Sequence, residues 1–465
     1  MIDLTQELDV LVAGGGNAAL CAAIAARRQG ASVLILEAAP RFFRGGNTRH
    51  TRNLRIAHDE PNGVLTGAYA ADEYWQDLKR VTAENTNDKL ARQAIDQSRE
   101  LMAWLTDQGV HFQPPFRGTL HLGRTNAFFL GGGRAMLNAL YSTAERLGVG
   151  VLYEAEVVDL SASDGVFEAA HLVHRGAHQT VRAKALVAAA GGYEANIAWL
   201  KESWGDQAEN FLIRGTPYNR GTVLRRLLER GARPVGEPKQ CHAVAIDARS
   251  PRFDGGIVTR LDCIVFGIVV NREAVRFYDE GEDLWTKRYA IWGRLLAEQP
   301  DQIGYVIIDS KAVNRFMPSV FPPMEGSSIG ELANQLGLKR DRLTRTVNEF
   351  NEAVQPGTFD ETILDDCRTE GIVPPKSHWA TRIDTPPFYG YPLRPGITFT
   401  YFGVAVNEDA KIGMQAGGAS ENMFAAGEIM VGNILGQGYL GGVGMTIGSV
   451  FGRIAGKGAA AHAAR

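Results

Sequence analysis

One segment near the N-terminus, residues 9–19, constrains the fold more than any other part of the chain. An apolar stretch at 10–12 runs into the pattern Gly-x-Gly-x-x-Ala, and an alanine-rich helix is expected over 18–28. Gly14 permits a tight turn from strand to helix, and Gly16 lets a pyrophosphate approach the backbone. The N-terminus of the helix offers N–H groups to the phosphates. The segment therefore predicts a strand–turn–helix unit that binds a dinucleotide.

A second strand supports this interpretation. Residues 32–36 are apolar apart from Ser32, and they are followed by Glu37. An acidic residue about 20 positions after the glycine turn holds a ribose hydroxyl in dinucleotide-binding folds. Strand, helix, strand and acid in this order predict an α/β fold of the Rossmann type.

Length and composition limit the other possibilities. The chain has 465 residues, 45% of them hydrophobic, and can form two or three domains around large cores. Its net charge of −3 gives no reason to expect nucleic acid as a partner. No apolar run reaches the roughly 18 to 20 residues that span a bilayer, and residues 1–7 lack the features of an export signal. We expect a cytoplasmic protein.

The cysteines indicate no metal site. Cys21, Cys241, Cys263 and Cys367 are scattered and form no C-x-x-C pair. Zinc binding, haem attachment and a disulfide framework are therefore unsupported, and no cysteine cluster is present to hold an iron–sulfur centre.

Later segments return to the same fold. A strand over 151–160 and a β-rich meander over 169–181 precede a buried strand at 185–190, which ends in a glycine pair. Residues 422–428 repeat the strand-to-glycine pattern, and the glycine-rich segment 436–448 then leads into a final helix. Distant segments that complete one sheet are typical of glutathione-reductase-type FAD domains, so the expected cofactor is FAD.

The intervening stretch, residues 237–398, has a different character. It contains fewer glycines, a short strand at 304–309 and charged helices within 328–353. We interpret it as an α+β capping domain inserted into a discontinuous FAD-binding domain, which comprises residues 1–236 and 399–465. A cap excludes water from a reaction and positions the substrate.

Four motifs carry a resemblance to a known family. They are Gly45-Gly46-Asn47-Thr48, Ala189-Ala190-Gly191-Gly192-Tyr193, Ala425-Ala426-Gly427-Glu428 and Gly452-Arg453-Ile454-Ala455-Gly456. The chain resembles the flavoproteins of fumarate reductase and succinate dehydrogenase over nearly its whole length, which implies an FAD-dependent oxidoreductase acting on CH–CH groups. Succinate dehydrogenases carry a flavin-linking His before the glycine pair. This chain has Phe42-Phe43-Arg44 there, so non-covalent FAD is implied.

Longer segments refine the resemblance. Residues 44–55, 128–134, 214–221 and 432–448 are similar to tricarballylate dehydrogenases. This similarity implies oxidation of a saturated C–C bond in a small polycarboxylate, tricarballylate to cis-aconitate, with hydride to the flavin and a proton to an Arg or Tyr. Tyr439 stands where fumarate reductases have a carboxylate-binding Arg, and 3-ketosteroid dehydrogenases have a Tyr in a similar setting. A ketosteroid-type dehydrogenase and a reductase of an unsaturated carboxylic acid therefore remain alternatives.

Positive charge gathers directly after Gly45-Gly46-Asn47-Thr48, a segment that we expect to face the flavin ring and call the flavin turn. The cationic or titratable residues there are Arg49, His50, Arg52, Arg55 and His58. Arginine forks hold carboxylates in bidentate fashion, so we expect the three arginines to bind a substrate with three carboxylates; a solvated basic loop is the alternative. By loose resemblance, Arg260 adds a further cation. Thr400, in the segment that replaces the family's His-His-Thr, completes the expected substrate ligands.

Three residues are candidates for catalysis by resemblance. Arg288 matches the family's proton-transferring Arg, with a relay acid among residues 280–283. Tyr439 is the rival for the proton, with a reference pKa near 10. His242 aligns with the family's substrate-binding His.

The resemblance and the glycine turns together predict the residues that bind FAD. At the pyrophosphate and adenosine we expect Gly14, Gly16, Asn17, Ala18, Glu37, Ala38 and Val157. Around the flavin ring and ribityl chain we expect Gly46, Asn47, Thr48, Ala190, Gly191, Glu428, Gly444, Met445 and Thr446. The dipole of the last helix would stabilise a reduced, anionic flavin at its N-terminus.

Electrons must leave or enter through another molecule. By resemblance, a membrane-bound iron–sulfur protein or a quinone pathway is the expected electron acceptor, which would bring the protein to the inner face of the membrane. A flavin-binding subunit that only passes electrons within a complex is the remaining alternative.

Overall fold

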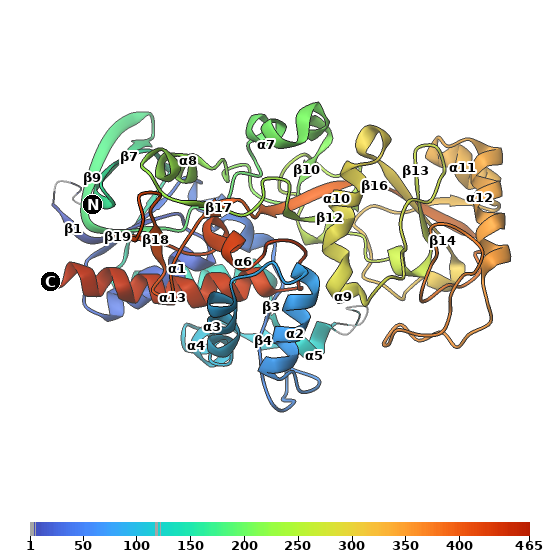
Figure 1. Cartoon of the computed structure of the whole chain (residues 1–465), viewed down its shortest axis with the longest axis horizontal. Coiled ribbons are helices and arrows are strands. Elements are labelled where there is room, and N and C mark those ends of the chain that lie inside the picture. Colours follow the sequence, from blue (N-terminus) through green and yellow to red (C-terminus); the bar gives the residue numbers. More distant parts are fainter. Residues whose placement is uncertain (1–3, 5, 117–119, 121) are drawn as a thin grey trace.

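The computed structural model describes residue 4, residues 6–116, residue 120 and residues 122–465. These form two lobes side by side along the long axis of the molecule (Figure 1). The C-terminus lies on the lobe that holds the parallel sheet (Figure 1). Strand β16 (Phe388–Thr400) runs between the two lobes and belongs to the sheet of the second.

The first lobe is built on an eight-stranded sheet with the path β18-β19-β9-β1-β2-β6, to which β7 and β8 add a hairpin beside β9. Its strands are β1 (Leu8–Ala13), β2 (Val33–Glu37), β6 (Gly150–Tyr153), β7 (Ala155–Ser163), β8 (Val166–His174), β9 (Ala177–Ala188), β18 (Lys411–Gly413) and β19 (Ala419–Ala425). The central strands are parallel: Val12 pairs with Ile35 of β2 and with Val187 of β9. Parallel strands are covered on both faces, which explains their continuous apolar runs.

Two helices pack across this sheet in backbone contact. They are α1 (Asn17–Arg28) and α13 (Val443–Ala463). A Cβ added to Gly452 would lie 2.5 Å from the Ala18 carbonyl oxygen, and one added to Gly456 would lie 2.1 Å from that of Ala22. The glycines of α13 therefore let the helices approach closely. The N-terminal ends of both helices reach the same cavity.

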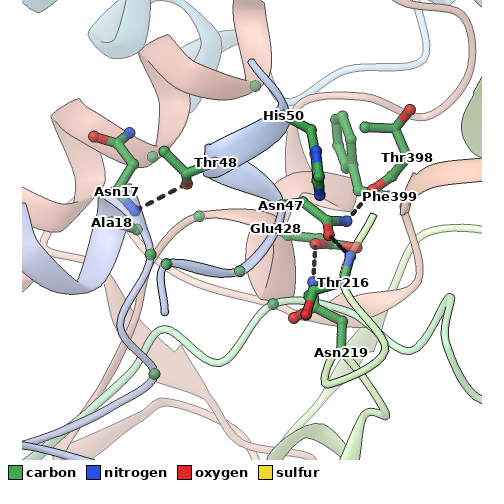
Figure 2. Close-up of a pocket in the computed structure, with 18 of the residues that line it drawn as sticks. Asn17, Ala18, Asn47, Thr48, His50, Thr216, Asn219, Thr398, Phe399 and Glu428 are labelled. Atoms are coloured by element: carbon green, nitrogen blue, oxygen red, sulfur yellow. Dashed lines mark hydrogen bonds between the residues drawn. The ribbon is translucent and has the colours of Figure 1, made fainter. Parts of the chain in front are cut away.

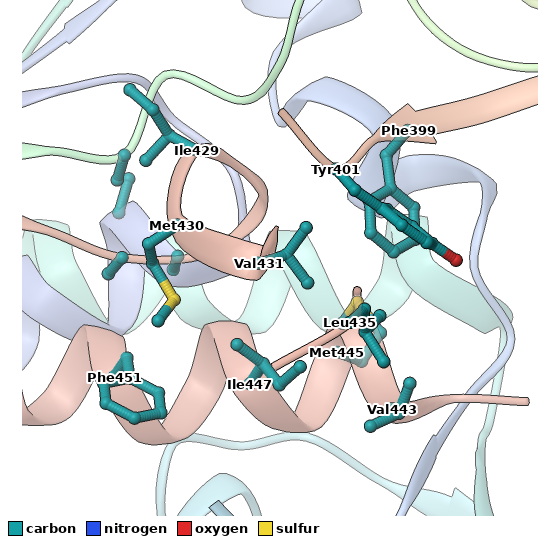
Figure 3. Close-up of a cluster of buried hydrophobic side chains, with 14 of the residues drawn as sticks. Phe399, Tyr401, Ile429, Met430, Val431, Leu435, Val443, Met445, Ile447 and Phe451 are labelled. Carbon is teal, nitrogen blue, oxygen red and sulfur yellow. The ribbon is translucent and has the colours of Figure 1, made fainter. Parts of the chain in front are cut away.

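The other face of α13 is tied to the chain that precedes it. Met445, Ile447 and Phe451 face Met430 and Val431, which lie in the short 3-10 helix η9 (Glu428–Asn433) (Figure 3). All five side chains are buried. This apolar contact fixes the glycine-rich turn that begins the helix.

The second lobe contains a six-stranded sheet with the path β10-β16-β14-β13, and β12 and β15 also pair with β16. Its remaining strands are β10 (Leu212–Ile213), β12 (Cys241–Asp247), β13 (Ile268–Asn271), β14 (Gly304–Asp309) and β15 (Met324–Gly326). Helices α11 (Ile329–Leu336) and α12 (Arg340–Ala353) cover it with a separate apolar cluster. The sheet draws in β10 and the end of β16, so the division at 237 and 398 stays a proposal.

Shorter elements complete the chain. The small sheets contain β3 (Asn53–Arg55), β4 (Phe112–Gln113) and β5 (Asn126–Phe129), and β11 (Pro234–Val235) with β17 (Gly403–Val404). The remaining helices are α2 (Ala71–Thr82), α3 (Asp88–Ser98), α4 (Leu101–Asp107), α5 (Leu122–Thr125), α6 (Gly132–Arg146), α7 (Ile197–Trp204), α8 (Thr222–Glu229), α9 (Trp285–Arg288) and α10 (Trp292–Ala297). Within the described ranges, no helix is both long and apolar enough to cross a membrane.

The expected elements agree with this fold except at two places. The single strand expected over 151–160 is two strands, β6 and β7, because Glu154 between them adopts a left-handed conformation with φ of 55°. The strand expected at 185–190 is the end of a longer strand, β9, which begins at Ala177 within the expected meander and ends at Ala188. The mixed α/β architecture with its parallel sheet is confirmed.

Candidate active site

The main cavity opens at the carboxyl ends of the parallel strands, where the loops after β1, β2, β9 and β19 meet the second lobe (Figure 2). Ligands of open α/β sheets bind at this edge. The cavity has two chemically different ends. One is lined by glycine turns and helix N-termini, and the other by arginines, histidines and aromatic rings.

The glycine-lined end leaves no room for side chains. Gly14 has a φ of +109°, and a Cβ there would lie 2.2 Å from the Ala189 carbonyl oxygen. A Cβ on Gly15 would lie 2.2 Å from Oε2 of Glu37. Bare backbone at the start of α1 is the cradle that a pyrophosphate requires. The residues present therefore fit a dinucleotide.

Glu37 lies at the end of β2 and lines the cavity. Its Oε1 accepts the Ala39 N–H at 2.9 Å, and its Oε2 accepts the Gly45 N–H at 3.0 Å. Burial raises the pKa of this carboxyl against these backbone donors. Glu37, the expected ribose ligand, thereby also fixes the flavin turn relative to β2.

Asn17 connects the two helices that meet at the cavity. Its backbone N–H donates to the Thr48 hydroxyl at 3.0 Å, as Figure 2 shows, and its side-chain amide donates to the Met445 carbonyl at 3.1 Å. The same amide donates to the Ser449 hydroxyl at 2.9 Å. The Asn17 side chain therefore holds α13 against α1, while its backbone faces the flavin turn.

Two buried carboxyl groups and two amides form a network beneath the middle of the cavity. Glu194 Oε1 accepts hydrogen bonds from Asn47 at 2.6 Å and from Asn219 at 2.8 Å. Glu428 Oε1 accepts the Thr400 N–H at 2.9 Å, and its Oε2 accepts from Asn219 at 3.4 Å. Burial, together with the neighbouring Glu194, raises the pKa of Glu428 well above its usual range. The pair therefore holds a proton more tightly than an isolated carboxyl group does.

Three arginines converge on the other end of the cavity: Arg52, Arg214 and Arg260. Arg260 donates to Asp262 Oδ2 at 2.6 Å, and Arg52 lies 3.9 Å from the same oxygen. Arg214 donates twice to the Thr398 hydroxyl, at 3.0 and 2.8 Å. Each guanidinium keeps one buried nitrogen without a hydrogen-bond partner among the described residues. Asp262 compensates only part of this charge.

The pKa values of these arginines record the same imbalance. Burial and the Arg260 cation lower the pKa of Arg52 to about 10, and they lower that of Arg214 to about 10 as well. Burial also opposes the charge of Arg260, but the Asp262 carboxylate outweighs it and raises that pKa. A bound anion would relieve the repulsion. This end of the cavity is therefore suited to an anionic ligand with more than one charge.

Aromatic rings line the same end of the cavity as the arginines. His242 stacks on Tyr439 with ring centroids 3.9 Å apart, and the Phe399 ring lies 5.6 Å from that of Tyr439. The Arg260 guanidinium lies 4.5 Å from the centre of the Tyr289 ring. Burial raises the pKa of both tyrosines above the usual range, so both keep their protons. Their hydroxyls are hydrogen-bonding groups at neutral pH.

His50 enters the cavity from the flavin turn, beside Asn47 and Phe399 (Figure 2). Its Nε2 contacts Oδ1 of Asp254, a residue of the loop after β12. Arg49 Nε lies 3.9 Å from the same carboxylate oxygen. Burial lowers the pKa of His50 to about 4 despite this carboxylate, so the imidazole is neutral at pH 7.

Most of the predicted site residues line this cavity. All the predicted FAD ligands do so except Thr446, whose hydroxyl donates to the Arg55 carbonyl. The cavity also contains Tyr439, His242, Arg52 and Arg260. Thr400 lies behind it, bonded to Glu428.

The structure departs from the expectation at three arginines. Arg55 is buried outside the cavity and donates to the Gly441 carbonyl at 2.9 Å and to the Tyr69 hydroxyl at 2.7 Å. Arg288 pairs with Glu282 at 2.9 Å and does not line the cavity. Arg49 lies over the Phe43 ring on the outer side of the flavin turn. Spacing alone could not distinguish these from Arg52, because a short strand and a one-turn helix decide which way each side chain points.

Several residues of the site were not nominated from the sequence. Arg214 and Asn219 belong to the segment 214–221, whose similarity to tricarballylate dehydrogenases was a usable signal. Tyr289 directly follows the nominated Arg288, and the register of α9 turns it into the cavity instead. Glu194 follows the second glycine pair, and nothing in the sequence marks it as a partner of Glu428.

The fold and the glycine-lined cavity define a dinucleotide-binding flavoprotein of the glutathione-reductase type. A family model described as "FAD binding domain" matches residues 9–445. The chain therefore belongs to this FAD-binding family, which includes the flavoproteins of fumarate reductase and succinate dehydrogenase. It is an FAD-dependent oxidoreductase, and its expected cofactor is confirmed.

Individual relatives are distant. A probable fumarate reductase, Ifc3, of Shewanella frigidimarina is 26% identical over 99% of this chain and 76% of its own length. An NADH:fumarate oxidoreductase of Klebsiella pneumoniae is 26% identical over 98% of this chain and 48% of its own. The open conformation of a flavocytochrome c3 fumarate reductase superposes with a TM-score of 0.75 at 22% identity, over 99% and 79% of the two chains.

A steroid enzyme shares the fold equally well. A 3-ketosteroid-Δ4-(5α)-dehydrogenase from Rhodococcus jostii RHA1, solved with 4-androstene-3,17-dione, superposes with a TM-score of 0.73 at 22% identity, over 99% of this chain and 98% of its own. Since both structures are this distant in sequence, the superpositions show the fold alone.

Proposed function

We propose that this enzyme interconverts a saturated and an unsaturated C–C bond in a small polycarboxylate, with tricarballylate and cis-aconitate as the favoured pair and FAD bound non-covalently. The observation that carries the proposal is the group of three buried guanidiniums, Arg52, Arg214 and Arg260. Among the described residues, only Arg260 of the three donates a hydrogen bond to a carboxylate, that of Asp262. Bound FAD supplies the two-electron acceptor or donor for this class of reaction.

The arginines would serve both binding and reactivity. Each has a buried nitrogen free for a carboxylate oxygen, and charge-assisted pairs of this kind are strong and directional. A carboxylate held by guanidiniums also withdraws electron density from the adjacent carbon, which makes its proton easier to remove. The stacked rings of His242 and Tyr439 would close the pocket against water.

A 3-ketosteroid is the second candidate, and the aromatic wall with Phe399 favours it. A neutral steroid, however, would bring no negative charge to three buried cations that Asp262 compensates only in part, and an uncompensated buried charge is strongly unfavourable. Phe128 and Phe129 of β5 are buried but do not line the cavity. The charge therefore favours the polycarboxylate.

Electron exchange with a separate carrier completes the proposal. Two fumarate reductases among the relatives carry the word cytochrome in their names, and a structural neighbour is a quinol–fumarate reductase with menaquinol. By analogy, we propose that a membrane iron–sulfur protein or a quinone pathway serves as the acceptor here.

The decisive experiment is an oxygen-free titration of the purified holoenzyme. Tricarballylate, succinate and a 3-ketosteroid are added separately while the flavin absorbance is followed. Bleaching by tricarballylate, with none by the steroid, is the expected result. Bleaching by the steroid alone would overturn the proposal, and bleaching by succinate alone would replace the tricarboxylate with a dicarboxylate.

A further inference from the structure

The substrate end of the cavity contains few groups able to accept a proton. Arginines Arg52, Arg214 and Arg260 are cations at neutral pH, and the raised pKa values of Tyr289 and Tyr439 keep both hydroxyls protonated. Oxidation next to a carboxylate nevertheless requires a base for the α-proton. Among the described residues that line this end, the two neutral imidazoles, His242 and His50, are left.

His242 is poorly placed to hold a positive charge. Both of its ring nitrogens are buried, and neither has a hydrogen-bond partner among the described residues. Burial and the cations of Arg214 and Arg260 lower its pKa well below the usual range. An imidazolium at this position would have no carboxylate to stabilise it, so His242 is better suited to packing against Tyr439 and the substrate.

His50 has what His242 lacks. Its Nε2 contacts the Asp254 carboxylate, and the Asp254 backbone N–H donates to the Gly215 carbonyl at 2.7 Å, which fixes the loop. A carboxylate at Nε2 holds the imidazole in the tautomer whose Nδ1 is a free acceptor, and it also stabilises the imidazolium that forms. Arg49 and Arg214 are the cations that oppose this charge.

The surroundings of the pair connect the cavity with solvent. The His50 side chain is 9% exposed and lines the cavity, whereas the Asp254 side chain is 25% exposed and lies outside it. Gly256 has a φ of +77°, and a Cβ there would lie 3.2 Å from His50 Nδ1, so the glycine leaves this nitrogen accessible. A proton received at Nδ1 can thus be relayed from Nε2 to a carboxylate that reaches water.

We propose that His50, oriented by Asp254, is the proton-transfer residue of this enzyme. The inference rests on the proposed function. In the oxidative direction the α C–H bond would break with its proton going to His50 Nδ1, the β C–H bond would give up a hydride to FAD when it is bound, and the electron pair left on the α carbon would form the C=C bond. The Nε2 proton of the imidazolium then passes to Asp254 and to solvent. In the reductive direction the same groups supply the proton.

The test compares His50→Gln and Asp254→Asn with the wild type, and with His178→Gln on the exposed part of β9 as the matched control. Bound FAD is first quantified by absorbance for each variant. Rapid mixing with tricarballylate without oxygen then gives a limiting rate of bleaching and a dissociation constant. We expect His50→Gln to lower the rate by about 10²–10⁴-fold, the usual contribution of a positioned base. The dissociation constant should change by less than about threefold, because the arginines carry the binding.

Asp254→Asn removes the orienting carboxylate and keeps the imidazole. Its rate should fall by about 10–100-fold, since an amide no longer selects the tautomer or stabilises the cation. Histidine ¹⁵N NMR provides a readout without turnover: one imidazole, assigned by its loss in His50→Gln, should show a protonated Nε2 in the wild type and lose that preference in Asp254→Asn.

The outcomes separate this inference from the proposed function. If tricarballylate bleaches the wild type and His50→Gln at similar rates with FAD fully bound, His50 is not the base although the function stands. A loss of affinity without a loss of rate would likewise overturn it, since His50 would then only bind. If none of tricarballylate, succinate and the 3-ketosteroid bleaches the wild type, the proposed function and this role fail together.

Discussion

The two ends of the cavity are built in different ways. The cofactor end is made of backbone, at the turns at Gly14 and Gly45 and at the beginnings of α1 and α13. Glycine is needed at these turns because a Cβ there would collide with neighbouring main chain or side chains. The substrate end is made of side chains that come from separate segments. Arg52 follows the flavin turn, Arg214 follows β10, and Arg260 lies in the second lobe. A backbone cradle is written locally in the sequence, whereas a cluster of side chains exists only after folding.

The electrostatics of the two ends also differ. At the cofactor end burial raises the pKa of Glu37, Glu194 and Glu428, so negative charge is suppressed where phosphates and a reduced flavin would lie. At the substrate end the arginines remain cations although burial lowers the pKa of two of them. The first end tolerates an anionic cofactor, and the second is destabilised until an anion arrives.

The largest expected effect concerns the backbone cradle. Gly14→Ala should yield protein without FAD, because its Cβ would lie 2.2 Å from the Ala189 carbonyl oxygen. Gly30→Ala is the matched control: it has a similar φ of +90° with nothing within 4 Å of the added Cβ, and should cost only about 1 kcal/mol with FAD retained. Flavin absorbance of the purified proteins measures both. If purified Gly14→Ala retained the flavin absorbance of bound FAD, the proposed role of this turn in cofactor binding would be contradicted.

The next effect breaks the cationic end while sparing the cofactor. Arg214→Gln should weaken transition-state binding by about 2–5 kcal/mol, which corresponds to a kcat/KM lowered by about 30- to 5,000-fold for tricarballylate. FAD content and the unliganded Tm should hold or improve, because the substitution removes an uncompensated buried charge. Arg225→Gln, which loses a surface contact with Glu202 and a contact with the Trp199 ring, serves as control. An unchanged kcat/KM in Arg214→Gln would contradict the proposal that this end of the cavity binds an anion.

A smaller effect concerns the buried carboxyl pair. The pKa of Glu428 is raised in the folded state, so the stability that the pair provides is complete below the unfolded pKa of about 4.5 and is lost as the pH rises through the folded value. Glu194→Gln removes one of the two like charges and should flatten this loss by about 1–2 kcal/mol. Urea unfolding of the holoenzyme from pH 5 to 9 measures it, with the exposed Glu229→Gln for comparison. Parallel pH curves for wild type and Glu194→Gln would contradict the shared proton.

The smallest effect is expected at Arg288. Since its guanidinium pairs with Glu282 and does not line the cavity, Arg288→Gln should keep turnover within about threefold. Steady-state rates with an artificial electron acceptor test this, and Glu282→Gln, which leaves Arg288 in place without its partner, is the companion variant. A loss of more than about 100-fold in Arg288→Gln, with FAD bound, would return the proton transfer to this arginine.

The cofactor end was predictable because its signals are local. Gly14, Gly16 and Glu37 predict the glycine turn and the acidic residue that follows it within one strand–helix–strand unit, and all three line the cavity. The later glycine turns at Gly191 and Gly427 mark the strands that join the same sheet. Glycine at a positive φ, or against a neighbouring backbone, is dictated by geometry that few other residues satisfy.

The substrate end was predictable only in part. The cluster after the flavin turn correctly placed Arg52 at the cavity, but Arg55, three residues further on, points into the protein and bonds Gly441 and Tyr69. Tyr289 lines the cavity, whereas its neighbour Arg288, the expected proton-transfer residue, does not, because the backbone at the end of the short helix α9 turns the ring inward. One residue along a helix rotates the direction of the side chain by about 100°, and no local pattern fixed that direction here.

The sequence by itself determined that this chain has a dinucleotide-binding fold, which strands form the parallel sheet and which glycines line the cofactor end of the cavity. The tertiary structure alone decided which arginines face the substrate, that Glu194 and Glu428 share a buried site, and that Asp254 contacts His50. The physical reason is the range of the interactions. Backbone conformation and steric exclusion act between neighbours in the chain, whereas the cavity's charge arises from separate segments, those of Arg52, Arg214 and Arg260, that meet only when both lobes are folded.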